Sequence, residues 1–90
     1  MADLADRLGA AVLAHPGVVR LDGGPFGTVA TALPGRRVVG VAVGARGVEV
    51  AVVLRADRPV PPVVAELREL VRGVAGPVPV DVHVSDVEEP

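Results

Sequence analysis

The chain has 90 residues with one Phe, no Trp, no Tyr and no Cys, and half of its residues are apolar. Such a length accommodates one small domain. Valine supplies 22 of the apolar residues, and these short β-branched side chains favour strands. The formal charge of −2 excludes an overall basic excess that would draw the chain onto nucleic acid or an anionic membrane. The absence of cysteine excludes disulfides and thiolate metal sites.

The first residues do not have the pattern of a secretory signal. Met1 is followed by Asp3 and Asp6 instead of a basic segment and a long apolar segment. The longest uncharged valine-rich run covers residues 38–45, whereas a membrane helix needs roughly 20 apolar residues. We therefore expect a cytoplasmic chain that does not span a membrane by itself.

The first third of the chain predicts a helix, a short strand and an ambiguous segment. Apolar residues recur at helical spacing over 3–14, and the carboxylate of Asp3 can cap the first turn. Pro16-Gly17 ends this helix, and a strand follows over 18–21. Apolar residues alternate weakly between Phe26 and Leu33, so an extra strand over 28–33 and a loop both stay open.

The middle of the chain contains the clearest hairpin. After the turn signal at Pro34-Gly35, residues 38–43 alternate between two faces of a strand. The turn at 44–47 leads into a second strand over 48–55, in which valine and leucine occupy one face.

The last third predicts a helix and a strand. Pro61 or Pro62 begins the helix, since a proline in the first turn has no intrahelical N–H bond to lose. Gly76-Pro77 ends it, and alternating valines predict a strand over 78–85. Residues 88–90 are expected to fray.

These elements predict an α+β fold of two layers in a single domain over residues 1–90. A mixed sheet of about four strands carries two helices on one face, because each helix has one apolar stripe. The order is helix, strand, strand, strand, helix, strand, and whether the segment 28–33 adds an extra strand stays open. If the second hairpin strand and the last strand are parallel neighbours, the helix between them forms the crossover.

The residue types that usually carry catalysis are scarce. We expect His15 to lie exposed at the end of the first helix, where a cation interacts favourably with the helix dipole. His83 shares a strand face with Asp81, and Asp86 follows, but a zinc site needs three or four converging ligands. Ser85 lacks the glycine elbow of a nucleophile. We therefore expect no catalytic residue, no metal site and no cofactor.

Glycine-rich segments and arginines are the basis of an alternative function. The GxxG pattern at 44–47 joins two predicted strands, whereas in nucleic-acid-binding KH domains such a loop joins two helices. Gly23, Gly24 and Gly27 resemble a phosphate-binding loop only loosely. A small nucleic-acid-binding module would use three arginines and have no aromatic platform for bases. These are Arg36, Arg37 and Arg46.

One face of the predicted hairpin is unusually apolar for a solvent-exposed surface. It carries small residues where a solvated sheet face normally carries threonine, lysine and glutamate. Two interpretations stay open, namely a third layer formed by the segment 26–33 and a surface for self-association or a partner. The residues of this candidate interaction face are Val38, Gly40, Ala42, Ala51 and Val53.

Four segments, taken in order, resemble the alkaline shock protein family, the Gls-type envelope stress response proteins of bacteria. Residues 11–21 resemble the family's first helix with its Pro-Gly-Val turn, and 47–54 its valine-rich strand. Residues 59–71 resemble its proline-introduced helix, and 80–87 its last strand. Residues 24–37 further resemble short actinobacterial members. The chain departs from the family pattern at 56–58, where Tyr-Gly is common, and at Asp81, where Asn is common.

The resemblance implies a non-enzymatic protein that supports the cell envelope under stress. It implies a chain made in the cytoplasm and often held at the membrane through a small membrane-anchor protein. Self-association is suggested instead by the apolar face of the predicted hairpin. It supplies no catalytic, cofactor-binding or metal-binding residues. The net charge and the single Phe make nucleic acid an unexpected partner.

Overall fold

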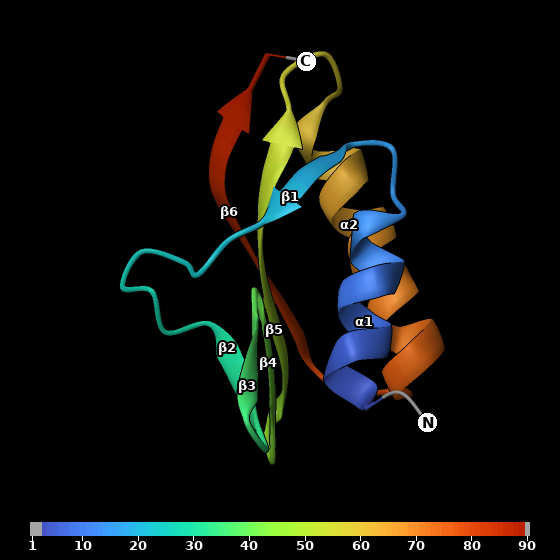
Figure 1. Cartoon of the computed structure of the whole chain (residues 1–90). Helices are drawn as coiled ribbons and strands as arrows, with labels where there is room; N and C mark the ends of the chain where they lie inside the picture. Colours follow the sequence, from blue (N-terminus) through green and yellow to red (C-terminus); the bar gives the residue numbers. More distant parts are fainter. Residues whose placement is uncertain (1–2, 90) are drawn as a thin grey trace.

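The computed structural model describes residues 3–89 and places two helices and six strands in them. In chain order these elements are α1 (Leu4–Leu13), β1 (Val18–Leu21), β2 (Ala30–Leu33), β3 (Arg36–Val39), β4 (Val41–Gly44), β5 (Gly47–Arg55), α2 (Val60–Ala75) and β6 (Val80–Glu88). Both helices pack side by side on one face of the sheet (Figure 1). The predicted α+β fold with two helices on a mixed sheet is therefore confirmed.

Strand β5 is the centre of the sheet. Strand β6 runs parallel to it along one edge, from the pair Val48–Val80 to the pair Arg55–Glu88. On the other edge β5 pairs antiparallel with β4 through its first half and with β1 through its second half. The helix α2 thus connects two parallel neighbours, as the sequence predicts.

The first strand of the predicted hairpin is not continuous, and this part of the prediction is wrong. Gly40 has a φ of +93° and separates β3 from β4. Strand β3 turns away and pairs with β2, so the open question over 28–33 resolves into a strand at Ala30–Leu33. A left-handed backbone conformation at glycine breaks a strand that the valine pattern alone would extend.

The Thr31 side chain hydrogen-bonds the small β2–β3 sheet to β4. The hydroxyl of Thr31 donates to the Val41 carbonyl at 2.7 Å and accepts from the Val43 N–H at 3.1 Å. Both groups belong to the edge of β4 that faces away from β5. Thr31 therefore satisfies polar groups that a neighbouring strand would otherwise bind.

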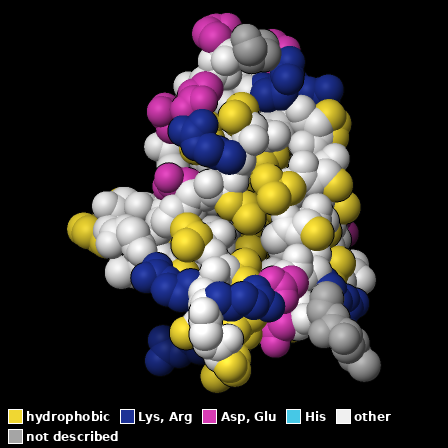
Figure 2. All heavy atoms as spheres, viewed as in Figure 1, with side chains coloured by type: hydrophobic (Ala, Val, Ile, Leu, Met, Phe, Trp, Pro, Cys, Tyr) yellow, Lys and Arg dark blue, Asp and Glu magenta, His cyan; other side chains and the backbone are white. Residues whose placement is uncertain are grey.

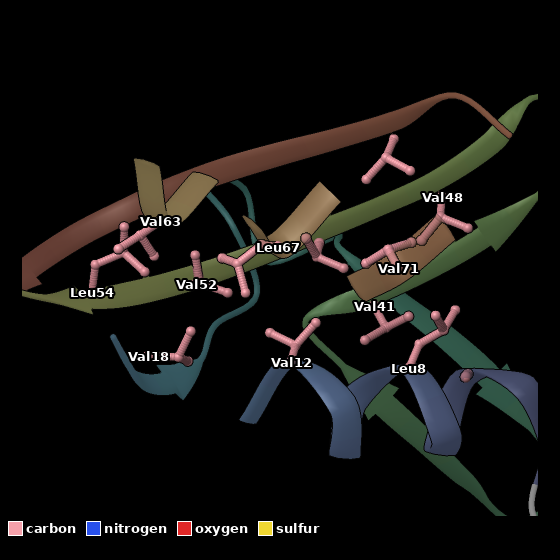
Figure 3. Packing of buried hydrophobic residues seen from close by; sticks show 13 residues of the cluster. Leu8, Val12, Val18, Val41, Val48, Val52, Leu54, Val63, Leu67 and Val71 are labelled. Atoms are coloured by element: carbon pink, nitrogen blue, oxygen red, sulfur yellow. The ribbon is translucent and has the colours of Figure 1, made fainter. Parts of the chain in front are cut away.

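The core lies between the sheet and the helices (Figure 3). Side chains from both helices and from β1, β4 and β5 point toward one another there, and nearly all of them are aliphatic. The labelled residues are Leu8, Val12, Val18, Val41, Val48, Val52, Leu54, Val63, Leu67 and Val71.

Element ends match the sequence predictions closely at α1 and β1 and differ at the start of α2 and at both ends of β6. Asp3 caps α1 by accepting from the Ala5 N–H at 3.0 Å. Helix α2 begins at Val60, slightly before the predicted prolines, which lie in its first turn. Strand β6 begins later and extends further than predicted: Glu88 does not fray, because its carboxylate binds Arg20 and its carbonyl accepts from the Ala56 N–H. Pro90 lies outside the described residues.

Candidate interaction surfaces

The five residues of the predicted interaction face do not form one exposed surface. Gly40, Ala51 and Val53 are buried. Val38 is partly buried and packs against the core near α1, on the helix side of the fold. Ala42 is also partly buried. The chain itself therefore covers most of this predicted face.

The segment after β1 covers the middle of β5. The Ala51 carbonyl accepts from the Asp22 N–H at 2.9 Å, and its N–H donates to the Gly40 carbonyl at 3.0 Å. Gly24 lies beside the Ala51 side chain and packs against the buried Val29. Of the two open interpretations, the structure shows the covering layer.

His15 is buried, which corrects the prediction of an exposed ring at the end of α1. Its Nδ1 accepts from the Gly17 N–H at 2.9 Å, so the ring proton of the neutral imidazole lies on Nε2. That nitrogen donates to the Glu66 carboxylate at 2.9 Å. The ring thus ties the turn after α1 to helix α2.

A shallow groove of about 720 Å³ lies beside His15 on the helix layer. Its walls are mostly apolar, and no hydroxyl side chain is among them. Leu70 is 37% exposed there and does not belong to the hydrophobic core cluster. The lining residues are His15, Ala65, Glu66, Glu69, Leu70, Gly73 and Val74. We call this set of residues the α2 groove.

Phe26 is the single aromatic residue and is 86% exposed. It lies in a turn closed by the Gly27 N–H, which donates to the Gly24 carbonyl at 3.1 Å. The segment that carries it juts out from the body of the protein between β1 and β2 (Figure 1). A hydrogen-bonded turn therefore presents a large apolar side chain to solvent. Figure 2 shows a further band of hydrophobic side chains across the middle of this side, between groups of charged residues.

The outer face of the sheet brings polar residues together without forming a metal site. The Ser85 hydroxyl binds the Asp22 carboxylate and, with the Gly24 N–H, holds the pKa of that carboxyl below its ordinary value. His83 Nε2 lies 2.9 Å from a carboxylate oxygen of Glu49. Within residues 3–89 no three His, Asp or Glu side chains are grouped as a metal site would require.

The three arginines of the nucleic-acid alternative lie on β3 and in the turn between β4 and β5. The guanidinium of Arg36 makes two hydrogen bonds, of 2.8 and 2.6 Å, to the carboxylate of Asp6 and thereby lowers the pKa of that carboxyl. Arg37 reaches the Gly27 carbonyl at 3.5 Å. Arg46 lies in the turn between β4 and β5. One of the three charges is thus already compensated within the chain.

Comparisons with protein-family models, curated proteins and solved structures found no match to this chain. Among the described residues, no helix is both long enough and apolar enough to cross a membrane. The resemblance to the alkaline shock proteins stays a prediction.

The sequence predicted neither the α2 groove nor the exposed position of Phe26. Leu70 belongs to the apolar stripe of α2 in the sequence pattern, but that stripe is wider than the surface the sheet covers. For Phe26, the turn signal Gly24-Pro25 beside an aromatic residue was the available indication.

Proposed function

We propose that this chain is a non-enzymatic adaptor or scaffold that acts through protein–protein contacts in the response of the cell envelope to stress. In this proposal it works at the cytoplasmic side of the membrane and attaches there through a membrane-anchor partner. The resemblance to the alkaline shock proteins supports the cellular role, and the exposed apolar surfaces support the contact role.

The α2 groove is the observation that carries the proposal. An apolar surface that stays open on a small folded domain commonly marks a contact site. Both ring nitrogens of His15 are already bonded, so the ring serves as a wall of the groove. Glu66 and Glu69 give the apolar floor a polar margin, an arrangement typical of interfaces.

The test is affinity purification from the native cell with two matched variants. Leu70→Ser alters the α2 groove, and Val43→Ser alters an equally exposed position on the hairpin, since both side chains are 37% exposed. We expect Leu70→Ser to lose the co-purified membrane-anchor protein and Val43→Ser to keep it. Equal recovery with both variants would show that the groove is not the contact site.

Nucleic-acid binding through Arg36, Arg37 and Arg46 is the alternative, and it makes a different prediction. Binding driven by phosphate contacts weakens steeply as salt rises, because counterions are released. A gel shift with single-stranded RNA or DNA at low salt, abolished by Arg37→Ala, would favour this alternative over the adaptor.

A further inference from the structure

Strand β6 forms an outer edge of the main sheet. It pairs with β5 on one side, and within the described residues no strand lies on its other side (Figure 1). An edge strand presents backbone N–H and C=O groups that another strand can bind.

Two hydrogen bonds at the ends of β6 show which of its backbone N–H and C=O groups point toward β5. The Pro79 carbonyl accepts from the Val48 N–H at 3.0 Å, and the Glu88 carbonyl accepts from the Ala56 N–H at 2.8 Å. Successive residues of a strand direct their backbone N–H and C=O groups to opposite sides. Asp81 and His83 therefore direct these groups toward β5, the side to which the Pro79 carbonyl points. The N–H and C=O groups of Val82 and Val84 therefore face away from the sheet.

Side chains cap both ends of this edge. At the start, Arg68 Nε donates to the Val80 carbonyl at 3.3 Å. Toward the end, the Asp86 carboxylate accepts from its neighbouring Val87 N–H at 2.8 Å. A bulge beside Val84 interrupts the register with β5. The uncapped part of the edge is the short segment from Val82 to Val84.

The two sides of this segment have different chemistry. Val82 and Val84 pair with the buried Val50 and Val52, so their side chains lie on the helix side of the sheet, where Val84 is 36% exposed. On the outer side Asp81 and Asp86 are exposed and, within residues 3–89, make no ion pair. The charge of Arg20 acts on Asp86 from the same side, but its guanidinium pairs with Glu88, and His83 is hydrogen-bonded to Glu49. The edge is thus apolar on one side and acidic on the other.

We propose that the β6 edge binds an extended segment of a partner protein as an added strand, with apolar and basic residues alternating along that segment. Its apolar residues would lie beside Val82 and Val84, and its basic residues beside Asp81 and Asp86. This binding mode rests on the proposed adaptor function and specifies the chemistry of one partner segment.

A second copy of the chain is a poorer occupant than a basic segment. Two β6 strands paired antiparallel about His83 would bring Asp81 and Asp86 of both copies to the same face. Like charges on adjacent strands are destabilising, whereas lysine or arginine in those positions would be attracted.

The test uses a blocked heptapeptide of alternating lysine and valine as the probe, titrated into the 90-residue chain and followed by NMR at low salt. We expect shifts concentrated in residues 80–88 and slower hydrogen exchange at the Val82 and Val84 amides by at least about tenfold, because both donors gain partners. The control peptide has proline at its centre and cannot complete the ladder.

Reversing the charge of Asp81 tests whether the acidic side of β6 recognises the peptide or whether the chain attracts basic peptides non-specifically. Asp81→Lys should weaken binding of the lysine peptide by about fivefold and favour a glutamate-valine peptide. Glu69→Lys makes the same charge change on the α2 groove and should alter neither affinity. Val84→Pro removes one outward N–H and should weaken binding by about tenfold if the domain stays folded.

The outcomes distinguish this proposal from the adaptor function. Absent binding, or equal binding of the proline control, overturns strand addition at β6 even if partner capture through the α2 groove persists. Equal effects of Asp81→Lys and Glu69→Lys overturn the acidic face as the determinant. Conversely, peptide binding together with unchanged co-purification of the membrane-anchor protein after Leu70→Ser would exclude the α2 groove as the contact site and would support the β6 edge.

Discussion

At the scale of single residues, Phe26 and Leu67 differ in exposure, and we expect them to differ in their contribution to the stability of the fold. Phe26 is 86% exposed, whereas Leu67 is fully buried between α2 and the sheet. We expect Phe26→Ser to change the free energy of unfolding by no more than about 0.5 kcal/mol and Leu67→Ala to lower it by about 2–5 kcal/mol. Urea unfolding followed by circular dichroism measures both. A large loss of stability in Phe26→Ser would mean that this side chain packs within the fold.

Gly40 is the residue whose backbone sets the division between β3 and β4. With a φ of +93°, a side-chain carbon added there would lie 2.6 Å from Cβ of Leu21. Gly40→Ala should therefore lower the free energy of unfolding by about 1–3 kcal/mol, since it combines strain with a clash. Gly44→Ala is the control, because its added carbon meets no atom within 4 Å and its φ is not positive. Equal stability of the two variants would contradict this account.

Some residue contacts could not be predicted from the sequence. Arg36 and Asp6 are 30 positions apart, and only the folded β2–β3 hairpin brings them together. Asp22 and Ser85 also meet only in the fold, because β1 and β6 both pair with β5. By contrast, the Asp3 cap is local to its helix and was predictable from spacing alone.

At the scale of elements, Thr31 links the small β2–β3 sheet to β4. Thr31→Val keeps the shape of the side chain but removes the hydroxyl that serves both Val41 and Val43. We expect a loss of about 1–3 kcal/mol, because the Val41 carbonyl, in a partly buried bond, and the Val43 N–H, in an exposed one, both lose their partner. Hydrogen exchange should quicken at the Val43 amide, while the same change at the exposed Thr28 should have no effect. Unaltered exchange in Thr31→Val would show that other contacts hold the hairpin.

The elements differ in how far local sequence determines them. Strand β5 and helix α2 have strong periodic patterns, and both form close to the predicted ranges. Strand β6 extends to Glu88 because Arg20 and Ala56 bind it from elsewhere in the chain. The break at Gly40 depends on the path of Asp22 beside it, which hydropathy alone does not encode.

At the scale of the whole molecule, paired carboxylates make stability depend on pH. The pKa values of Asp6, Asp57 and Glu88 are lowered, chiefly by hydrogen bonds from arginine side chains, and that of Asp22 chiefly by Ser85. A carboxyl with a lowered pKa in the fold contributes stability above its unfolded pKa and loses it as the pH falls through the folded one. The ordinary values are 3.8 for Asp and 4.5 for Glu, so the loss begins in that range and continues below it.

We therefore expect the urea midpoint of the protein to fall as the pH is lowered from 6 to 3. Asp6→Asn should weaken this dependence, because it removes one of the contributing carboxyls. Glu89→Gln is the matched control, since Glu89 is exposed and has no ion pair within residues 3–89. An identical pH dependence in wild type and Asp6→Asn would contradict the role of the Asp6–Arg36 pair.

The claim that this protein acts through contact is tested most directly by photo-crosslinking in the native cell. A photoreactive residue at position 70, in the α2 groove, is compared with one at position 58, an exposed loop position. We predict a discrete adduct from position 70 alone, reduced by excess untagged wild-type chain and unaffected by excess untagged Leu70→Ser chain. Equal adducts from both positions, or only the uncrosslinked chain from each, would contradict the account.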